Sequence, residues 1–167
     1  FSGAYGKGIW TDGTNIYYSY DEHQAVIQGD TWVKKTWNGT NDFCGYYVWT
    51  DGTNTYLSGR LSGKTYHYVL QGDTWASKSW GGTNYFTAKD IWTDGENFYI
   101  SIGRSHYVLQ GNTWVEKTWN GLTTFNADDI WTDGKNIYCN QDYVLNGDTW
   151  EPTTFVGSSD LEFERSF

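Results

Sequence analysis

Four aspartates recur in the same short stretch and could do carboxylate chemistry. The tetrapeptide Trp-Thr-Asp-Gly occurs four times, and its aspartates are Asp12, Asp51, Asp94 and Asp133. Gathered in a ring, they could bind a cation or exchange protons with a substrate. Acid–base catalysis, however, needs carboxylates in different surroundings so that their pKa values separate, and four equivalent positions do not provide this. Because Asp and Gly tolerate the backbone angles of tight hairpins, we expect each Asp-Gly pair to form a turn instead.

Three histidines and two cysteines are the other residues that could bind a metal or act as nucleophiles. His67 and His106 are equivalent in the repeat described below, so they lie in different units, and neither they nor His23 show a metal-binding spacing. Cys44 and Cys139 lack the spacing of a zinc or redox motif, and we expect buried thiols. Phosphate loops, nucleophile elbows and calcium loops are absent from the sequence. We therefore expect no enzymatic activity, no metal and no cofactor.

These residues are positioned by a unit that recurs four times in the 167-residue chain. The tryptophans of the tetrapeptide stand at 10, 49, 92 and 131, which gives a period of about 40 residues. Each unit contains four short segments rich in Trp, Tyr, Ile, Val and Thr, separated by Asp-Gly, Gly-Asp or Asn-Gly pairs. Such segments are typical of strands joined by tight turns, and four strands in each repeat are typical of a β-propeller blade.

The sequence therefore predicts an all-β fold, a β-propeller of four blades that closes by itself or belongs to a larger propeller. Each blade is expected to be a four-stranded antiparallel sheet. We expect the blades at about 1–39, 40–82, 83–121 and 122–157, followed by a C-terminal tail or closing strand at 158–167. Because the chain contains no Met, we also expect it to be a mature product or a part of a longer chain.

The repeat resembles the kelch family of β-propellers over nearly the whole chain. In that family, a Tyr of the second strand and a Trp that opens the fourth strand pack between neighbouring blades. The matching residues are Tyr17, Tyr56, Tyr99 and Tyr138, and Trp32, Trp75, Trp114 and Trp150. The double glycine of the family is absent, so the chain resembles a divergent form. It looks most like Trp-Thr-Asp-Gly arrays in tail-associated proteins of bacterial viruses and in bacterial surface proteins, which implies an extracellular location on a virion or a cell surface.

A second interpretation is a solenoid of hairpins, as in choline-binding and other cell-wall-binding repeats. Those repeats are also rich in Trp, Tyr, Gly and Asp. They are roughly half as long as the unit here, however, and the two halves of this unit are not interchangeable. A propeller is therefore the favoured interpretation.

The charge of the chain limits its partners. The formal net charge is −9 with only 11 Lys and Arg residues, which argues against a nucleic acid or an anionic lipid surface as partner. No apolar run approaches the roughly 18 residues that a membrane-spanning helix needs, so no membrane insertion is expected.

The four copies disagree most in the connection between the second and third strands. It reads YDEHQ at 20–24, GRLSGKTYH at 59–67, IGRSH at 102–106 and QD at 141–142. In a propeller these connections share one face, here called the variable face, with the linkers between blades. Because loops on a rigid scaffold often carry recognition, we predict that this face binds a ligand. Its candidate residues are Tyr20, Asp21, His23, Arg60, Lys64, Tyr66, Arg104, His106 and Asp142.

The predicted function is thus a non-enzymatic binding or adhesion module that recognises a glycan or a protein through the variable face. One alternative is a structural spacer in a phage tail or surface assembly. Another is a hairpin-repeat module that binds the cell wall. If four blades do not close alone, we expect a homodimer in which two chains share a larger ring.

Overall fold

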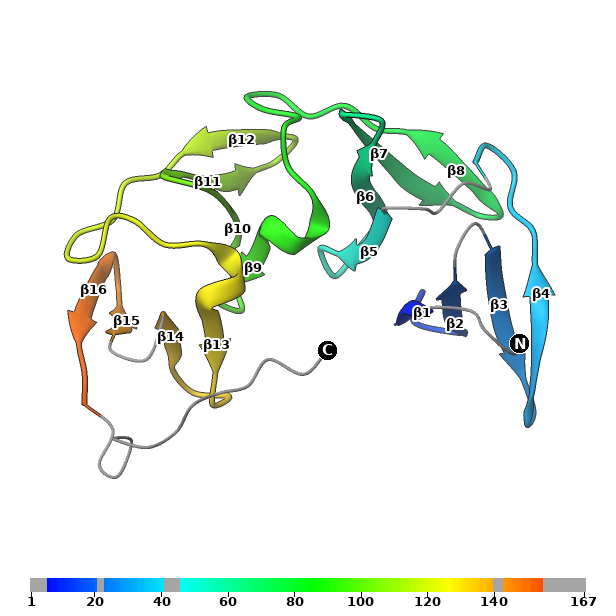
Figure 1. Cartoon of the computed structure of the whole chain (residues 1–167), viewed down its shortest axis with the longest axis horizontal. Coiled ribbons are helices and arrows are strands. Elements are labelled where there is room, and N and C mark those ends of the chain that lie inside the picture. Colours follow the sequence, from blue (N-terminus) through cyan, green and yellow to red (C-terminus); the bar gives the residue numbers. More distant parts are fainter. Residues whose placement is uncertain (1–5, 21–22, 41–45, 140–142, 155–167) are drawn as a thin grey trace.

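The structure is a computed structural model that describes residues 6–20, 23–40, 46–139 and 143–154. Within these residues, sixteen strands form four sheets, and each sheet contains four antiparallel strands in chain order. The sheets follow one another along an arc (Figure 1), so the predicted all-β fold with four propeller blades is confirmed. Because each sheet has four strands, the alternative of a solenoid built from two-stranded hairpins is wrong.

Blade 1 consists of β1 (Gly6–Thr11), β2 (Ile16–Tyr20), β3 (His23–Gln28) and β4 (Thr31–Lys35). Blade 2 consists of β5 (Tyr46–Thr50), β6 (Thr55–Leu61), β7 (Lys64–Gln71) and β8 (Thr74–Ser77). Blade 3 consists of β9 (Ile91–Thr93), β10 (Phe98–Ile102), β11 (Ser105–Gln110) and β12 (Thr113–Glu116). Blade 4 consists of β13 (Ile130–Thr132), β14 (Ile137–Cys139), β15 (Tyr143–Asn146) and β16 (Thr149–Pro152). Short 3-10 helices precede the last two blades, η1 (Ala88–Asp90) and η2 (Ala127–Asp129).

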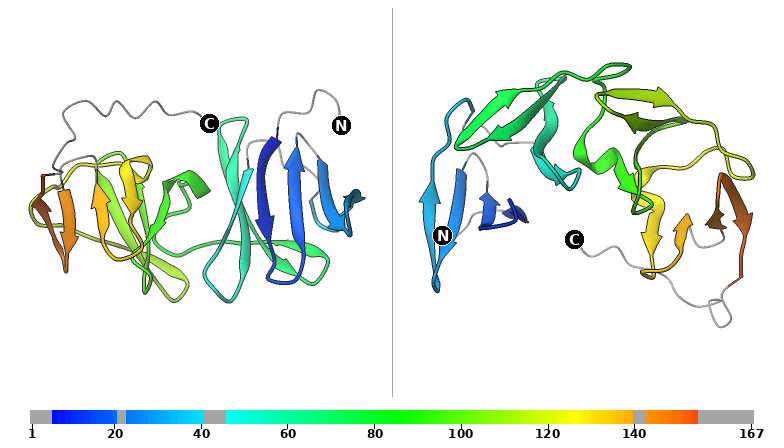
Figure 2. Two further views of the ribbon diagram at one scale, coloured as in Figure 1. Left: turned by 90° about the horizontal axis from the view of Figure 1, so that it is seen from below. Right: turned by 180° about the vertical axis from the view of Figure 1, so that it is seen from behind.

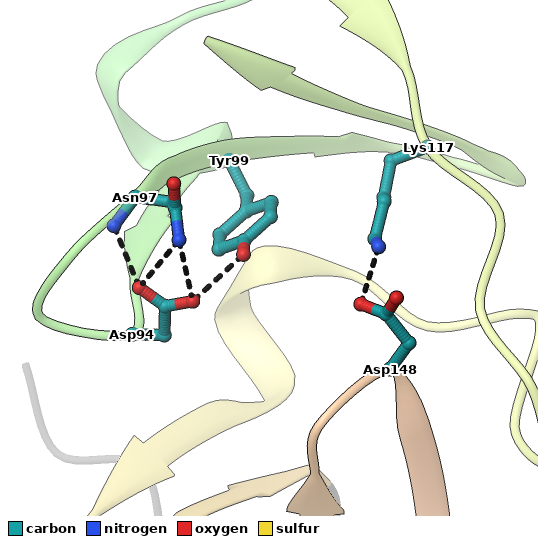
Figure 3. A network of polar contacts seen from close by, with 5 residues as sticks. All are labelled: Asp94, Asn97, Tyr99, Lys117 and Asp148. Carbon is teal, nitrogen blue, oxygen red and sulfur yellow. Dashed lines mark hydrogen bonds and ion pairs between the residues drawn. The ribbon is translucent and has the colours of Figure 1, made fainter.

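The first hairpin of each blade has a turn that is held together by the aspartate of Trp-Thr-Asp-Gly. In blade 3, Oδ1 of Asp94 accepts hydrogen bonds from the backbone N–H groups of Glu96 and Asn97, at 2.9 and 2.7 Å. The Tyr99 hydroxyl donates to Oδ2 of Asp94 at 2.7 Å (Figure 3). Equivalent bonds surround the other three aspartates, Asp12, Asp51 and Asp133. The prediction that these residues form turns is confirmed.

Aromatic rings fill the space between neighbouring blades. The ring of Trp75, from the fourth strand of blade 2, lies 5.9 Å from Trp10 and 5.7 Å from Trp37 of blade 1. Trp150 makes the equivalent contacts with Trp92 and Trp119, and Trp114 packs against Trp80 and Phe86. Trp75, Trp114 and Trp150 are at most 1% exposed, so the core lies between the blades as three aromatic clusters. Each such ring buries roughly 150–250 Å².

A backbone bridge accompanies each aromatic cluster. Between blades 1 and 2, the N–H of Asn38 donates to the carbonyl of Asp73 at 3.0 Å, and the N–H of Trp75 donates to the carbonyl of Asn38 at 2.9 Å. The next residue, Gly39, has a φ of +87°, and a Cβ there would lie 2.1 Å from the Trp75 carbonyl oxygen. Only glycine therefore fits at this position. The glycines that follow the other two bridges are equally crowded, namely Gly82 and Gly121.

The described strands of the four blades form an arc. In both face-on views, the described strands of blade 1 and blade 4 lie on opposite sides of an opening (Figures 1 and 2). The two blade faces that border the opening are more exposed than the faces that pack between neighbouring blades. Trp131 of blade 4 is 42% exposed, whereas its counterpart Trp92 is buried.

Candidate ligand-binding site

A pocket of about 450 Å³ lies on the variable face where blades 2 and 3 meet. It is lined by Tyr47, Arg60, Thr65, Tyr85, Phe86, Thr87, Lys89, Asp90 and Ile102. Arg60 and Thr65 flank the turn between β6 and β7, and residues 85–90 belong to the linker from blade 2 to blade 3. The pocket thus combines the two kinds of connection that a propeller places on this face.

The linker supplies one wall of the pocket. Tyr85 is 56% exposed, and the guanidinium carbon of Arg60 lies 4.9 Å from the centre of its ring. This cation–π contact holds the two side chains against each other. The neighbouring Phe86 is buried and stacks on His67 at 4.3 Å between ring centres. The wall therefore has a packed base and one accessible aromatic ring.

The helix η1 positions the charges of the pocket. The backbone N–H and the hydroxyl of Thr87 both donate to Oδ2 of Asp90, the hydroxyl at 3.1 Å, and the N–H of Asp90 donates back to the Thr87 carbonyl at 3.0 Å. This is a capping box, and its hydrogen bonds occupy the carboxylate of Asp90, which is the one carboxylate among the lining residues. Lys89 and Arg60 are exposed, and neither forms an ion pair with another described residue. The two cations are therefore available to a ligand.

One polar atom of the lining is unsatisfied among the described residues. Oγ1 of Thr65 is buried and has no hydrogen-bond partner there. A buried polar group in this state destabilises the protein by about 1–3 kcal/mol. A ligand oxygen within reach of this hydroxyl would recover part of that free energy.

Arg60 is the predicted residue that lines this pocket. Lys64, at the start of β7, is exposed but does not line it. Tyr66 is 37% exposed, and its ring lies 6.4 Å from that of Tyr46. Because side chains alternate along a strand, Tyr66 lies on the opposite face of the sheet from Thr65.

His106, another predicted residue of the variable face, has a side chain that is only 4% exposed. Its Nδ1 lies 3.1 Å from the Ser101 hydroxyl, and its ring stacks on Phe125 at 4.1 Å. Burial lowers the pKa of His106. Its equivalent in blade 2, His67, is packed in the same way against Phe86. Both histidines therefore bind the linker that leads to the next blade.

The remaining predicted residues are not gathered at the pocket. His23 is exposed at the start of β3, and Arg104 is exposed in the turn between β10 and β11. Tyr20 is the last residue of β2. Asp21 and Asp142 lie outside the described residues. The described members of the predicted set are thus spread over blades 1 to 3.

Sequence reasoning missed the linker residues of the pocket, although a signal was present. When the linkers are aligned on Phe86 and Phe125, Tyr85 corresponds to Thr124 and Lys89 corresponds to Asp128. The repeat therefore does not require an aromatic ring or a lysine at these positions. Comparing the linkers as closely as the strand connections would have singled them out.

Further observations limit the kinds of chemistry that the described residues can support. They contain no group of three or more His, Cys, Asp and Glu side chains that could hold a metal ion. Within the same residues, no helix is long and apolar enough to cross a membrane. Cys139 is buried, and Cys44 lies outside the described part of the chain. Comparisons with protein-family models, curated proteins and solved structures give no match.

Proposed function

We propose that the protein is a non-enzymatic carbohydrate-binding module and that its site is the pocket between blades 2 and 3. The observation that supports this function is the exposed ring of Tyr85 beside Arg60 and Lys89 at a pocket of about 450 Å³. Pockets of about 300–1,000 Å³ with an apolar lining and a few polar groups are typical ligand sites. An aromatic ring offers a flat apolar surface for the C–H face of a sugar, and the polar groups around it can bind hydroxyls.

The charges of the pocket favour an acidic saccharide. Arg60 and Lys89 give two positive charges, and the carboxylate of Asp90 is held by Thr87. This is a local excess of positive charge on a chain whose formal net charge is −9. A guanidinium binds a carboxylate through two parallel hydrogen bonds, which a neutral hydroxyl cannot match. We therefore expect a sugar carboxylate to be recognised here.

The lining also supports binding without catalysis. Glycoside hydrolysis uses two carboxyl groups on either side of the bond that is broken. The lining contains one, Asp90, and its Oδ2 accepts two hydrogen bonds from Thr87. In the proposed role, the protein holds a glycan and makes or breaks no covalent bond. Display on a virion or a cell surface would place such a module where glycans occur.

A glycan array with neutral, sialic acid and uronic acid saccharides tests this function. We expect acidic glycans to bind the wild-type chain and Tyr85→Ala to weaken binding at least about tenfold, since truncating a central aromatic contact commonly has this effect. Tyr66→Ala is the matched control, because it removes an exposed Tyr from the face of blade 2 that lies opposite Thr65 of the pocket. Binding to no glycan, or equal loss in both variants, would contradict the proposal and favour a structural spacer.

A further inference from the structure

His67 is buried behind the wall of the pocket that carries Tyr85 and Phe86. Its side chain is 4% exposed, and its ring stacks on that of Phe86 at 4.3 Å between ring centres. Its Nε2 lies 2.9 Å from the carbonyl oxygen of Asn84, the residue that precedes Tyr85. One imidazole ring therefore holds the linker at the residues directly before and after Tyr85.

The hydrogen bonds of His67 require its neutral form. Because the Asn84 carbonyl can only accept, Nε2 carries the proton and donates it. Nδ1 then accepts from the Ser58 hydroxyl at 2.9 Å. The oxygen of this hydroxyl accepts in turn from the indole N–H of Trp49 at 2.9 Å. Each donor thus has an acceptor along a continuous chain of bonds from Trp49 to Asn84.

A second proton on His67 breaks this chain of bonds. Once Nδ1 carries a hydrogen, it can no longer accept from Ser58, which is fully buried. A buried hydroxyl that loses its acceptor is costly. The ring also becomes a buried cation, and it forms no ion pair with another described residue. The cationic form is therefore unstable in the place that the neutral ring occupies.

The charges around His67 disfavour the cation further. The titratable groups of the surrounding elements are the cations Arg60, Lys78 and Lys89, the carboxylate of Asp90, and the phenols of Tyr47 and Tyr85. The one carboxylate among them is occupied by hydrogen bonds from Thr87. No neighbouring group thus compensates a positive charge on the ring.

We propose that His67 is a positioning residue of the pocket and that protonation of its ring weakens the binding of acidic glycans. The proposal rests on the carbohydrate-binding role of the same pocket. When the charged ring leaves its buried place, it releases the Asn84 carbonyl and no longer supports Phe86. The contact between Tyr85 and Arg60 then loses its fixed base.

A bound sugar carboxylate acts on His67 in the opposite direction, because it attracts the cation. Arg60 and Lys89 already compensate this carboxylate at the pocket, so we expect the attraction to be the smaller effect. Burial lowers the pKa of His67 below its ordinary 6.5. Affinity should therefore be highest above this pH and should fall as the pH drops through the lowered value.

The other blades provide matched comparisons. In blade 3, Nδ1 of His106 lies 3.1 Å from the Ser101 hydroxyl, so the same arrangement recurs at a different joint. In blade 1, the buried Gln24 takes the position of His67, and its Nε2 donates to the Ser19 hydroxyl at 2.7 Å. The fold thus accepts glutamine at this position, and glutamine does not titrate.

An NMR titration tests the positioning role without a ligand. Lowering the pH from about 7.5 to about 5 spans the range in which histidines change charge. We expect the amide signals of Tyr85 and Phe86 to shift together with the ring signals of His67. These shifts should disappear in His67→Gln and remain in His106→Gln. Amide signals that do not follow the titration of His67 would overturn the proposal.

Titration calorimetry with N-acetylneuraminic acid and with glucuronic acid measures the effect on binding over the same pH range. The apparent affinity scales with the fraction of protein in the competent state, so we expect the wild type to lose at least about threefold. His67→Gln should bind equally well at both ends of the range, and His106→Gln should behave like the wild type.

Two outcomes of the calorimetry would overturn the proposal. One is an affinity of the wild type that stays constant or rises on acidification. The other is an equal loss in His67→Gln. Failure of both saccharides to bind at either pH would count against the carbohydrate function instead, and the NMR titration still decides whether His67 positions the wall.

Discussion

The hydroxyl of Tyr99 donates a hydrogen bond of 2.7 Å to Oδ2 of Asp94, five residues earlier in the chain (Figure 3). The ring of Tyr99 stacks on Trp92 at 4.3 Å in the cluster between blades 3 and 4. Through this bond, a carboxylate at an exposed hairpin turn is connected to the buried aromatic core. The four aspartates therefore stabilise the blades at their turns.

Replacing this carboxylate should destabilise the protein. Asp94→Ala removes the acceptor of two backbone N–H groups and of the Tyr99 hydroxyl, and we expect the free energy of unfolding to fall by about 1–3 kcal/mol. Urea denaturation measures the change. Glu96→Ala alters an exposed residue of the same turn and should change the free energy by less than about 0.5 kcal/mol. Equal effects of the two substitutions would contradict the role of Asp94.

The aspartate turns should make the protein sensitive to strong acid. Burial acts to raise the pKa of Asp12, but hydrogen bonds from the N–H groups of Asn15 and Thr14 and from the Tyr17 hydroxyl lower it from 3.8 to about 2. The pKa of Asp94 is lowered for the same reasons. Because the unfolded chain binds these protons first, the stabilisation is fully present above about pH 4 and is lost as the pH falls towards 2. Thermal melts across this range should show a falling midpoint, and a constant midpoint would contradict the prediction.

The two buried histidines should add a second pH dependence nearer to neutrality. Burial lowers the pKa of His67 below its ordinary 6.5, although the hydrogen bond with the Asn84 carbonyl opposes this, and burial lowers that of His106 as well. Their contribution to stability is therefore present above about pH 6.5 and is lost as the pH falls through the lowered values. Blade 1 has the buried Gln24 at the equivalent position. The double variant His67→Gln, His106→Gln should lose this dependence in denaturant melts, while His23→Gln should retain it.

The glycines of the joints should tolerate no side chain. A Cβ at Gly82, where φ is +76°, would lie 1.9 Å from the Trp114 carbonyl oxygen. We expect Gly82→Ala to destabilise the protein by more than about 4 kcal/mol or to prevent folding. Gly111 has a similar φ of +59° but nothing within 4 Å of an added Cβ, so Gly111→Ala should cost only about 1–2 kcal/mol. Similar melting temperatures for the two variants would show that crowding at the joint is unimportant.

If the pocket binds an acidic saccharide, its affinity should depend on salt. The cations Arg60 and Lys89 are exposed, so added salt screens their attraction to a carboxylate. Titration calorimetry should show weaker binding as ionic strength rises, and Lys89→Gln should flatten this dependence. Lys34→Gln, which removes an exposed lysine of blade 1, should leave it unchanged. An affinity that is independent of salt would contradict recognition through charge.

The parts of the fold that depend on local patterns could be predicted from the sequence. Strand alternation, the Asp-Gly turns and the recurring Trp can each be recognised in the sequence of a single repeat. The burial of His106 could not be predicted, because it depends on Phe125, which belongs to the linker leading to the next blade. The pocket could not be predicted from the sequence for a related reason. Arg60 and Tyr85 lie in different segments, and only the packing of blade 3 against blade 2 brings them together.

The backbone bridges also determine which parts of the described arc should unfold locally most easily. Each bridge links a blade only to its immediate neighbour, as in Asn38 with Trp75, so cooperativity passes from blade to blade instead of through one shared centre. Blades 2 and 3 are held on both sides, whereas blades 1 and 4 each have one bridge among the described residues. Amide hydrogen exchange should therefore be slowest in the middle of the arc and fastest where its ends fray. The pocket with Arg60 and Tyr85 lies at the middle joint, where we therefore expect the smallest fluctuations.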